Sequence, residues 1–144
     1  MFQVPSLCKE QVEALAQFFS KRDVFINLPT SYGKLLKFQA APVMADTLFP
    51  RSTGTSIVVV ISSLKALIED QVRNLNKLSL SAVCISDQHD DRLVQDIING
   101  QYTHVYGSPE CFLKSTCRGI FGSKKFQESL VCIAVDEAHC ISQW

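Results

Sequence analysis

The sequence predicts an α/β fold in which a mostly parallel sheet carries helices on both faces. Runs of β-branched and aliphatic residues, such as Ile57–Ile61, have the length and composition of strands that are buried on both sides. Segments with apolar residues at helical spacing, such as residues 64–75, alternate with these runs. Such alternation is typical of an α/β domain with a parallel sheet. The length of 144 residues suits one domain.

The first third of the chain predicts a helix, a strand and a second helix. Residues 9–20 carry apolar side chains at helical spacing, and residues 24–28 form a short apolar run. Pro29 marks the end of that strand, because proline cannot donate to a sheet ladder. Residues 34–48 are typical of a helix, although Pro42 is expected to kink or end it.

The rest of the chain continues the alternation. We expect strands at 57–61, 82–85, 104–106 and 130–135, helices at 64–75 and 93–98, and an irregular stretch with short helical pieces at 109–127. In an open α/β sheet, ligands bind beyond the carboxyl ends of the strands, so functional residues are expected directly after them.

Composition excludes some classes of partner. The 14 basic and 14 acidic residues cancel, so no overall field attracts nucleic acid or a charged membrane, and any nucleic-acid contact must be local. The most basic stretch, from Lys114 to Lys125, favours a solvated loop and leaves a phosphate-contacting patch as the alternative. No apolar run approaches the ~20 residues that cross a bilayer, so no membrane partner is expected.

The six cysteines do not predict a metal site. None forms a C-x-x-C pair and none has a histidine at a matching spacing, so we expect no zinc in this segment. Cys84 and Cys132 lie in apolar runs, as free core thiols do. This usage indicates reduced thiols and an intracellular compartment.

A candidate phosphate-binding loop follows the first predicted strand. It runs from Pro29 through Thr30, Ser31, Tyr32 and Gly33 to Lys34, where the next helix begins. Backbone N–H groups and the positive end of a helix dipole attract an anion at such a turn, and a lysine adds a full charge. Taken alone, a Gly-Lys pair is more often an ordinary turn.

A pair of carboxylates follows the last predicted strand. Asp136 and Glu137 come directly after Leu130–Val135, which we expect to be buried. An acid at a strand end can hold a hydrated Mg²⁺ ion, and its neighbour can orient and deprotonate a water molecule aimed at a terminal phosphate. A solvated polar turn is the alternative, but the pairing with an upstream phosphate loop favours a nucleotide site.

Together these motifs resemble the RecQ family of DNA helicases over essentially the whole chain. The segments that carry the resemblance are Gln11, the phosphate loop, Asp70-Gln71-Val72, Tyr106-Gly107-Ser108-Pro109-Glu110 and the run from Asp136 to Trp144. The final run, with Cys140-Ile141-Ser142-Gln143-Trp144 after the acidic box, is the most diagnostic. An unrelated P-loop ATPase is the weakest alternative, because that run argues against it.

The resemblance implies a fold and an activity. It implies the first of two RecA-like lobes of a P-loop NTPase, ATP and Mg²⁺ as ligands, DNA as partner, 3'-to-5' unwinding driven by ATP hydrolysis, and a nuclear location. By position, the implied roles are Lys34 on the outer phosphates, Pro29, Thr30, Ser31, Tyr32, Gly33 and Leu35 in the phosphate loop, Gln11 on adenine, Asp136 on magnesium, Glu137 on the attacking water, and His139, Gln143 and Trp144 in coupling to DNA. For Gln11, a polar residue on a solvated helix face is an equal alternative.

The chain departs from the family in its loop and in its length. Leu35 stands where the family has a Ser or Thr whose hydroxyl binds magnesium, Ser31 replaces a glycine, and Ser63 a proline. The sequence stops at Trp144, so residues 1–144 are expected to be an incomplete first lobe that lacks the second lobe and does not unwind DNA by itself. A degenerate nucleotide- or DNA-binding module without turnover is therefore the second hypothesis, and Leu35 motivates it.

Overall fold

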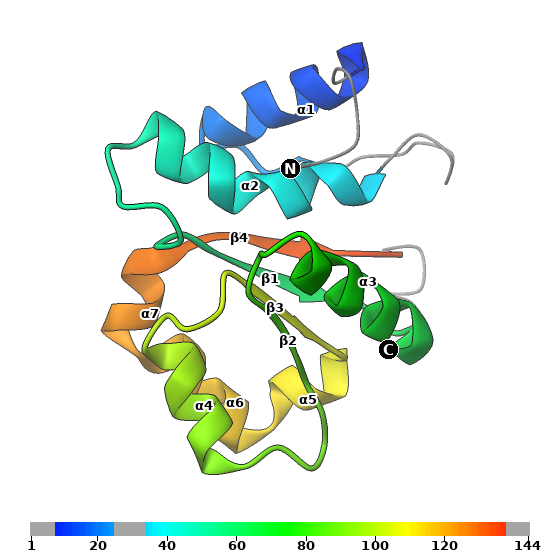
Figure 1. The fold of residues 1–144 in the computed structure, drawn as a ribbon, viewed down its shortest axis with the longest axis vertical. Helices are drawn as coiled ribbons and strands as arrows, with labels where there is room; N and C mark the ends of the chain where they lie inside the picture. The colour runs from blue at the N-terminus through cyan, green and yellow to red at the C-terminus, as the bar shows by residue number, and fades with distance from the viewer. Residues whose placement is uncertain (1–7, 25–33, 138–144) are drawn as a thin grey trace.

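The computed structural model describes residues 8–24 and 34–137, which form one sheet with helices on both faces (Figure 1). The helices are α1 (Lys9–Phe19), α2 (Lys34–Leu48), α3 (Lys65–Lys77), α4 (Asp91–Ile98), α5 (Pro109–Leu113), α6 (Ser115–Gly122) and α7 (Lys124–Ser129). The strands are β1 (Ile57–Ile61), β2 (Ala82–Ile85), β3 (His104–Gly107) and β4 (Leu130–Val135). The α/β prediction is confirmed, but the predicted strand at 24–28 lies almost entirely outside the described residues.

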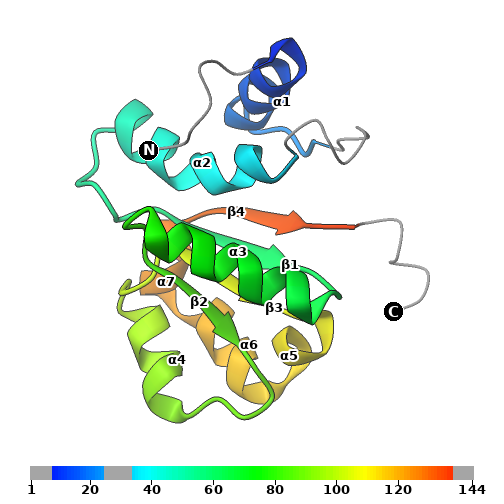
Figure 2. The same ribbon diagram turned by 45° about the vertical axis from the view of Figure 1, so that its right-hand side comes forward.

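The four described strands are parallel and follow the order β2-β3-β1-β4 (Figure 2). In the register, Val60 of β1 lies between Tyr106 of β3 and Ala134 of β4. Parallel strands need long crossover connections, and the helices between them supply these. All four strands therefore end at the same edge of the sheet.

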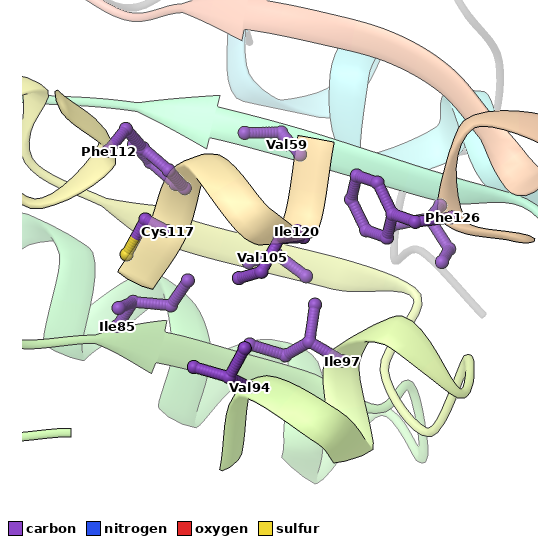
Figure 3. Packing of buried hydrophobic residues seen from close by; sticks show 10 residues of the cluster. Val59, Ile85, Val94, Ile97, Val105, Phe112, Cys117, Ile120 and Phe126 are labelled. Carbon is purple, nitrogen blue, oxygen red and sulfur yellow. The ribbon is translucent and has the colours of Figure 1, made fainter. Parts of the chain in front are cut away.

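Two apolar cores lie on opposite faces of the sheet. On one face, Val59 and Val105 pack against α4, α5, α6 and α7, and Figure 3 shows Phe112, Ile120 and Phe126 reaching this core. On the other face, Val58, Val60 and Tyr106 pack against α2 and α3. Alternate residues of β1 thus face opposite cores, as expected for a strand buried on both sides.

Strand β4 corrects one expectation. Residues 130–135 were expected to form a fully buried strand, yet Ile133 is 51% exposed and Val135 is 40% exposed. Within the described residues β4 pairs with β1 alone, so it is the outermost strand of this sheet. Cys132 and Ala134 pack toward α2 and α3, whereas the other core is centred on β1, β2 and β3.

Helix α2 continues through Pro42 rather than ending there. Contacts with α1, β1 and β4 hold it in place, so tertiary packing offsets the lost backbone hydrogen bond. Near its end, Asp46 accepts hydrogen bonds from the Gly54 and Ser56 amides at 2.7 and 3.0 Å. This buried carboxylate fixes the turn that leads into β1.

The segment after β3 is more regular than the irregular stretch expected for residues 109–127. It forms the three short helices α5, α6 and α7. The Ser108 hydroxyl accepts from the Cys111 amide at 3.3 Å, and Pro109 follows at the first helical position, so α5 has a regular N-terminus. A Cβ on Gly107 would lie 2.8 Å from the Phe112 ring, so a larger residue there would require this ring to shift.

His104 ties β3 to α2 and gives the fold a pH dependence. Its Nε2 lies 2.8 Å from the Gln39 carbonyl and its Nδ1 lies 2.8 Å from the Thr103 hydroxyl. Burial lowers the pKa of His104, against a smaller opposing effect of the Gln39 carbonyl. A neutral ring that donates from Nε2 and accepts at Nδ1 satisfies both partners.

We expect the free energy of unfolding to decrease as the pH falls from about 7 to about 5, because an unfolded histidine takes up a proton near pH ~6.5 while folded His104 resists it. The unfolded state then binds more protons, and stability is lost with falling pH. Urea unfolding at stepped pH measures this, and His104→Gln should reduce the slope. A variant with an unchanged slope would contradict the role given to His104.

Candidate nucleotide site

The carboxyl ends of β1, β3 and β4 meet at one edge of the sheet. The Ser62 amide, just after β1, donates to the Gly107 carbonyl at 3.1 Å. The Asp136 amide, just after β4, donates to the Ile61 carbonyl at 2.9 Å. These bonds bring the segments that follow the three strands together, at the edge where ligands of open α/β sheets bind.

Asp136 is held rigidly at this edge. It is 8% exposed, and its Oδ1 accepts from the Glu137 amide at 3.0 Å. A buried carboxylate in a fixed orientation is a suitable ligand for a hard cation, because Mg²⁺ prefers oxygen ligands.

Glu137 has an unusual backbone conformation. Its φ angle is 53°, in the left-handed region that non-glycine residues rarely adopt. Such strain costs on the order of 1–3 kcal/mol and is found most often at functional sites. This strained backbone lies within the Asp136–Glu137 turn, and Glu137 itself is half-buried.

The first turn of α2 lies at the same end of the molecule. Figures 1 and 2 both place the start of α2 beside the end of β4. Helix α2 starts at Lys34 and extends over 15 residues, so its N-terminus carries the positive end of a helix dipole. The side chains of Lys34 and Leu35 lie outside the described part of the chain, as do Pro29, Thr30, Ser31, Tyr32 and Gly33.

Two further polar residues lie in the core on the α2–α3 face of the sheet. Tyr106 is fully buried, and burial, with a smaller contribution from the nearby Asp136 carboxylate, raises its pKa to about 12. Gln71 is also buried, and neither atom of its side-chain amide has a hydrogen-bond partner among the described residues. Both belong to segments that carried the sequence resemblance, but no role was predicted for them. The sequence feature that could have identified them is a polar side chain on the apolar face of a helix or strand.

Gln11 is not on a solvated helix face, so that alternative is wrong. It is 5% exposed in α1, and its Oε1 accepts from the Cys8 amide at 2.9 Å. The side chain turns back to the start of its own helix, where the first amides lack intrahelical partners. The predicted contact with adenine stays a prediction.

The described residues fit a magnesium ion held mainly by a nucleotide. Within 8–24 and 34–137, no group of three or more His, Cys, Asp or Glu side chains could hold a metal. Mg²⁺ is commonly bound through one or two carboxylates, with water and substrate phosphates completing the shell. Asp136 alone at the sheet edge suits that mode of binding.

A helicase family model covers nearly the whole chain. The model described as DEAD/DEAH box helicase matches residues 8–144. The chain belongs to the DEAD/DEAH box helicase family. No described helix of this helicase domain is long and apolar enough to cross a membrane.

Relatives of the domain confirm the resemblance to RecQ helicases. The chain is 33% identical over 149 aligned positions to the ATP-dependent helicase SGS1 of Saccharomyces cerevisiae, covering 100% of the chain and 10% of that protein. It is 31% identical to the ATP-dependent DNA helicase RecQ of Synechocystis, covering 93% and 27%. It is 35% identical to the bifunctional 3'-5' exonuclease/ATP-dependent helicase WRN of Mus musculus, covering 86% and 8%. The chain spans at most about a quarter of the length of these three relatives.

The basic stretch of the helicase domain is not the solvated loop that the sequence favoured. Lys114 begins α6 as its N-cap, and Lys124 and Lys125 begin α7, on the face opposite α2 and α3. Lys114 forms an ion pair with Asp87, which raises the pKa of Lys114 and lowers that of Asp87. The Lys125 ammonium donates to Asn99 at 3.1 Å. Two of these cations therefore already have protein partners.

The residues predicted to couple the helicase site to DNA are not described. His139, Gln143 and Trp144 lie beyond residue 137, so the structure does not test their roles. Among the predicted site residues, the structure brings Asp136 and Glu137 together with the backbone start of α2.

Proposed function

We propose that this chain is the nucleotide-binding part of an ATP-dependent DNA helicase of the RecQ type. The observation that carries the proposal is the Asp136–Glu137 turn, which places two acidic residues directly after β4, beside the start of α2. The family supports ATP as the ligand, and the names of the relatives support DNA as the substrate.

A few groups at the site would carry out the proposed binding and hydrolysis of ATP. The start of α2 and the loop of Pro29, Thr30, Ser31, Tyr32 and Gly33 would bind the phosphates through backbone N–H groups. Lys34 would neutralise the outer phosphates, and Asp136 would hold Mg²⁺, which supplies charge neutralisation when bound. Glu137 would orient the attacking water and accept its proton. Gln11 would contact adenine.

The coupling of hydrolysis to DNA is assigned to the residues after the acidic box. His139, Gln143 and Trp144 would connect the nucleotide to single-stranded or partly duplex DNA, with 3'-to-5' polarity. Residues 1–144 would be part of the first RecA-like lobe, and strand separation would require the second. A nuclear location belongs to this proposal, because two of the three relatives come from eukaryotes and the proposed substrate is DNA.

Leu35 favours a second candidate function, a module that binds nucleotide without turnover. The residue occupies the second position of α2, where a side chain would lie next to the phosphates. Leucine has no oxygen to offer to Mg²⁺, so metal positioning depends on Asp136, water and the phosphates. Loss of a metal ligand slows phosphoryl transfer more than it weakens nucleotide binding, because catalysis here is mostly positioning.

Leu35→Ser separates the two candidates. We expect the variant to hydrolyse ATP at least about tenfold faster than the wild type in the presence of single-stranded DNA, because a magnesium ligand is restored. Phosphate release at saturating Mg²⁺ measures the rate. Leu36→Ser serves as a matched control that should not gain activity. A measurable wild-type rate equal to that of Leu35→Ser would eliminate the degenerate module and leave the working ATPase.

A further inference from the structure

A pocket lies at the opposite end of the molecule from the nucleotide site. It has a volume of about 350 Å³ and is formed by the ends of α1 and α2 and by Leu130 and Val131 at the start of β4. Strand β4 has six residues, so it separates the pocket from Asp136 by about 20 Å. We call this site the α1–β4 pocket. Its volume is within the range of small-ligand sites, ~300–1,000 Å³.

Three phenylalanines give the pocket an apolar wall. The Phe18 and Phe19 ring centroids lie 5.3 Å apart, and those of Phe19 and Phe49 lie 6.4 Å apart. Phe49 is 46% exposed and its neighbour Leu48 is 58% exposed. Adjacent large apolar side chains at the surface, rimmed by polar groups, are typical of a binding site.

Three cations surround this wall. Lys21, Arg22 and Arg51 line the pocket, with Asp23 as the one acidic residue of the lining. Ion pairs among the described residues join Arg73 to Asp70 and Lys114 to Asp87, so these three cations have no ion-pair partner there. The lining carries an excess of two positive charges although the whole chain has none.

The turn after α1 carries two of these cations, Lys21 and Arg22. Lys21 has a φ angle of 61°, a left-handed conformation that favours glycine, and its amide donates to the Phe18 carbonyl at 2.9 Å. The Arg22 guanidinium donates to the Gln17 side chain at 3.2 Å. Lys21 and Arg22 thus lie just after α1, and both line the pocket.

We propose that the α1–β4 pocket binds an acidic peptide segment of a partner protein, with an aromatic side chain seated against Phe19 and Phe49. Charge complementarity with Lys21, Arg22 and Arg51 selects the acidic residues. The phenylalanine rings meet one another at angles of 54° and 71°, so they do not offer the parallel faces on which successive bases would stack. The interaction is independent of the nucleotide site.

A short fluorescein-labelled peptide that alternates glutamate with phenylalanine tests the proposal by fluorescence anisotropy with the full chain. We expect saturable binding that weakens at least about fivefold in Arg22→Gln/Arg51→Gln and in Phe49→Ala, because such anchor residues dominate peptide interfaces. Arg92→Gln, at an exposed position of α4, is the matched control and should bind as the wild type does. Thermal unfolding checks that the variants fold, and their ATP binding should be unchanged.

Four results would contradict the proposal, and each says what the α1–β4 pocket binds instead, or that it does not bind the peptide. Equal affinity for the same peptide with lysine in place of glutamate would overturn the charge selection. Absence of peptide binding, together with oligothymidylate binding that weakens in Arg22→Gln/Arg51→Gln, would make the pocket a nucleic-acid site. A chain mass by light scattering that halves in Arg22→Gln/Arg51→Gln would make the occupant a second copy of the chain. If neither Arg22→Gln/Arg51→Gln nor Phe49→Ala changed peptide binding, the peptide would bind elsewhere on the chain.

Discussion

Phe126→Ala is expected to lower the free energy of unfolding by about 3–5 kcal/mol, the cost of truncating a buried aromatic side chain. Phe126 in α7 is fully buried and packs edge-on against Phe121 with ring centroids 5.9 Å apart. It belongs to the core that joins α4–α7 to β1 and β3. Domains are stable by only about 5–15 kcal/mol, so this loss would be a large share of the total stability. Urea unfolding followed by circular dichroism measures the change.

Leu113→Ala is the control for this prediction. Leu113 is 67% exposed, so its truncation should change the free energy of unfolding by less than about 0.5 kcal/mol. If Phe126→Ala were as mild as Leu113→Ala, then α7 would not be part of the core that packs against β1 and β3.

Lys34→Ala is expected to weaken ATP binding by about 10- to 100-fold. A hydrogen bond to a charged group contributes about 1.5–3 kcal/mol, and each 1.4 kcal/mol is a factor of ten in affinity. The residue starts α2, so the helix dipole would still attract the phosphates after the side chain is removed. Isothermal titration calorimetry with MgATP measures the dissociation constants.

Lys124→Ala is the matched control, since Lys124 is exposed at the start of α7 and away from the sheet edge that carries Asp136. The control should bind ATP as the wild type does. If Lys34→Ala retained full affinity while the wild type bound ATP, the phosphates would have to lie elsewhere than at the start of α2.

The strongly patterned elements of the fold could be predicted from the sequence. The β-branched run at Ile57–Ile61 and the apolar run at Leu130–Val135 form strands with the expected bounds, because apolar runs of that length fit a sheet buried by helices. The amphipathic segments became α1, α3 and α4. The position of Asp136 and Glu137 directly after a strand was also predicted, whereas their roles stay predictions.

Features that depend on distant contacts could not be predicted. The exposure of Ile133 depends on β4 being the outermost described strand, which one strand's sequence does not reveal. Gln11 is buried and its side-chain oxygen accepts from the Cys8 amide, although its spacing resembles that of a surface residue. The left-handed turns at Lys21 and Glu137 carry no glycine that would have marked them. The pocket between α1 and β4 joins residues far apart in the sequence.

Titration of the wild-type chain with ATP, in Mg²⁺ and in EDTA, tests the central claim most directly. The Asp136–Glu137 edge and the start of α2 predict saturable binding at one site that weakens when Mg²⁺ is removed, because phosphate charge then lacks a counter-ion beside Asp136. Asp136→Asn should reduce this dependence on Mg²⁺. Absence of saturable ATP binding by the folded wild-type chain would contradict a nucleotide site at this edge of the sheet.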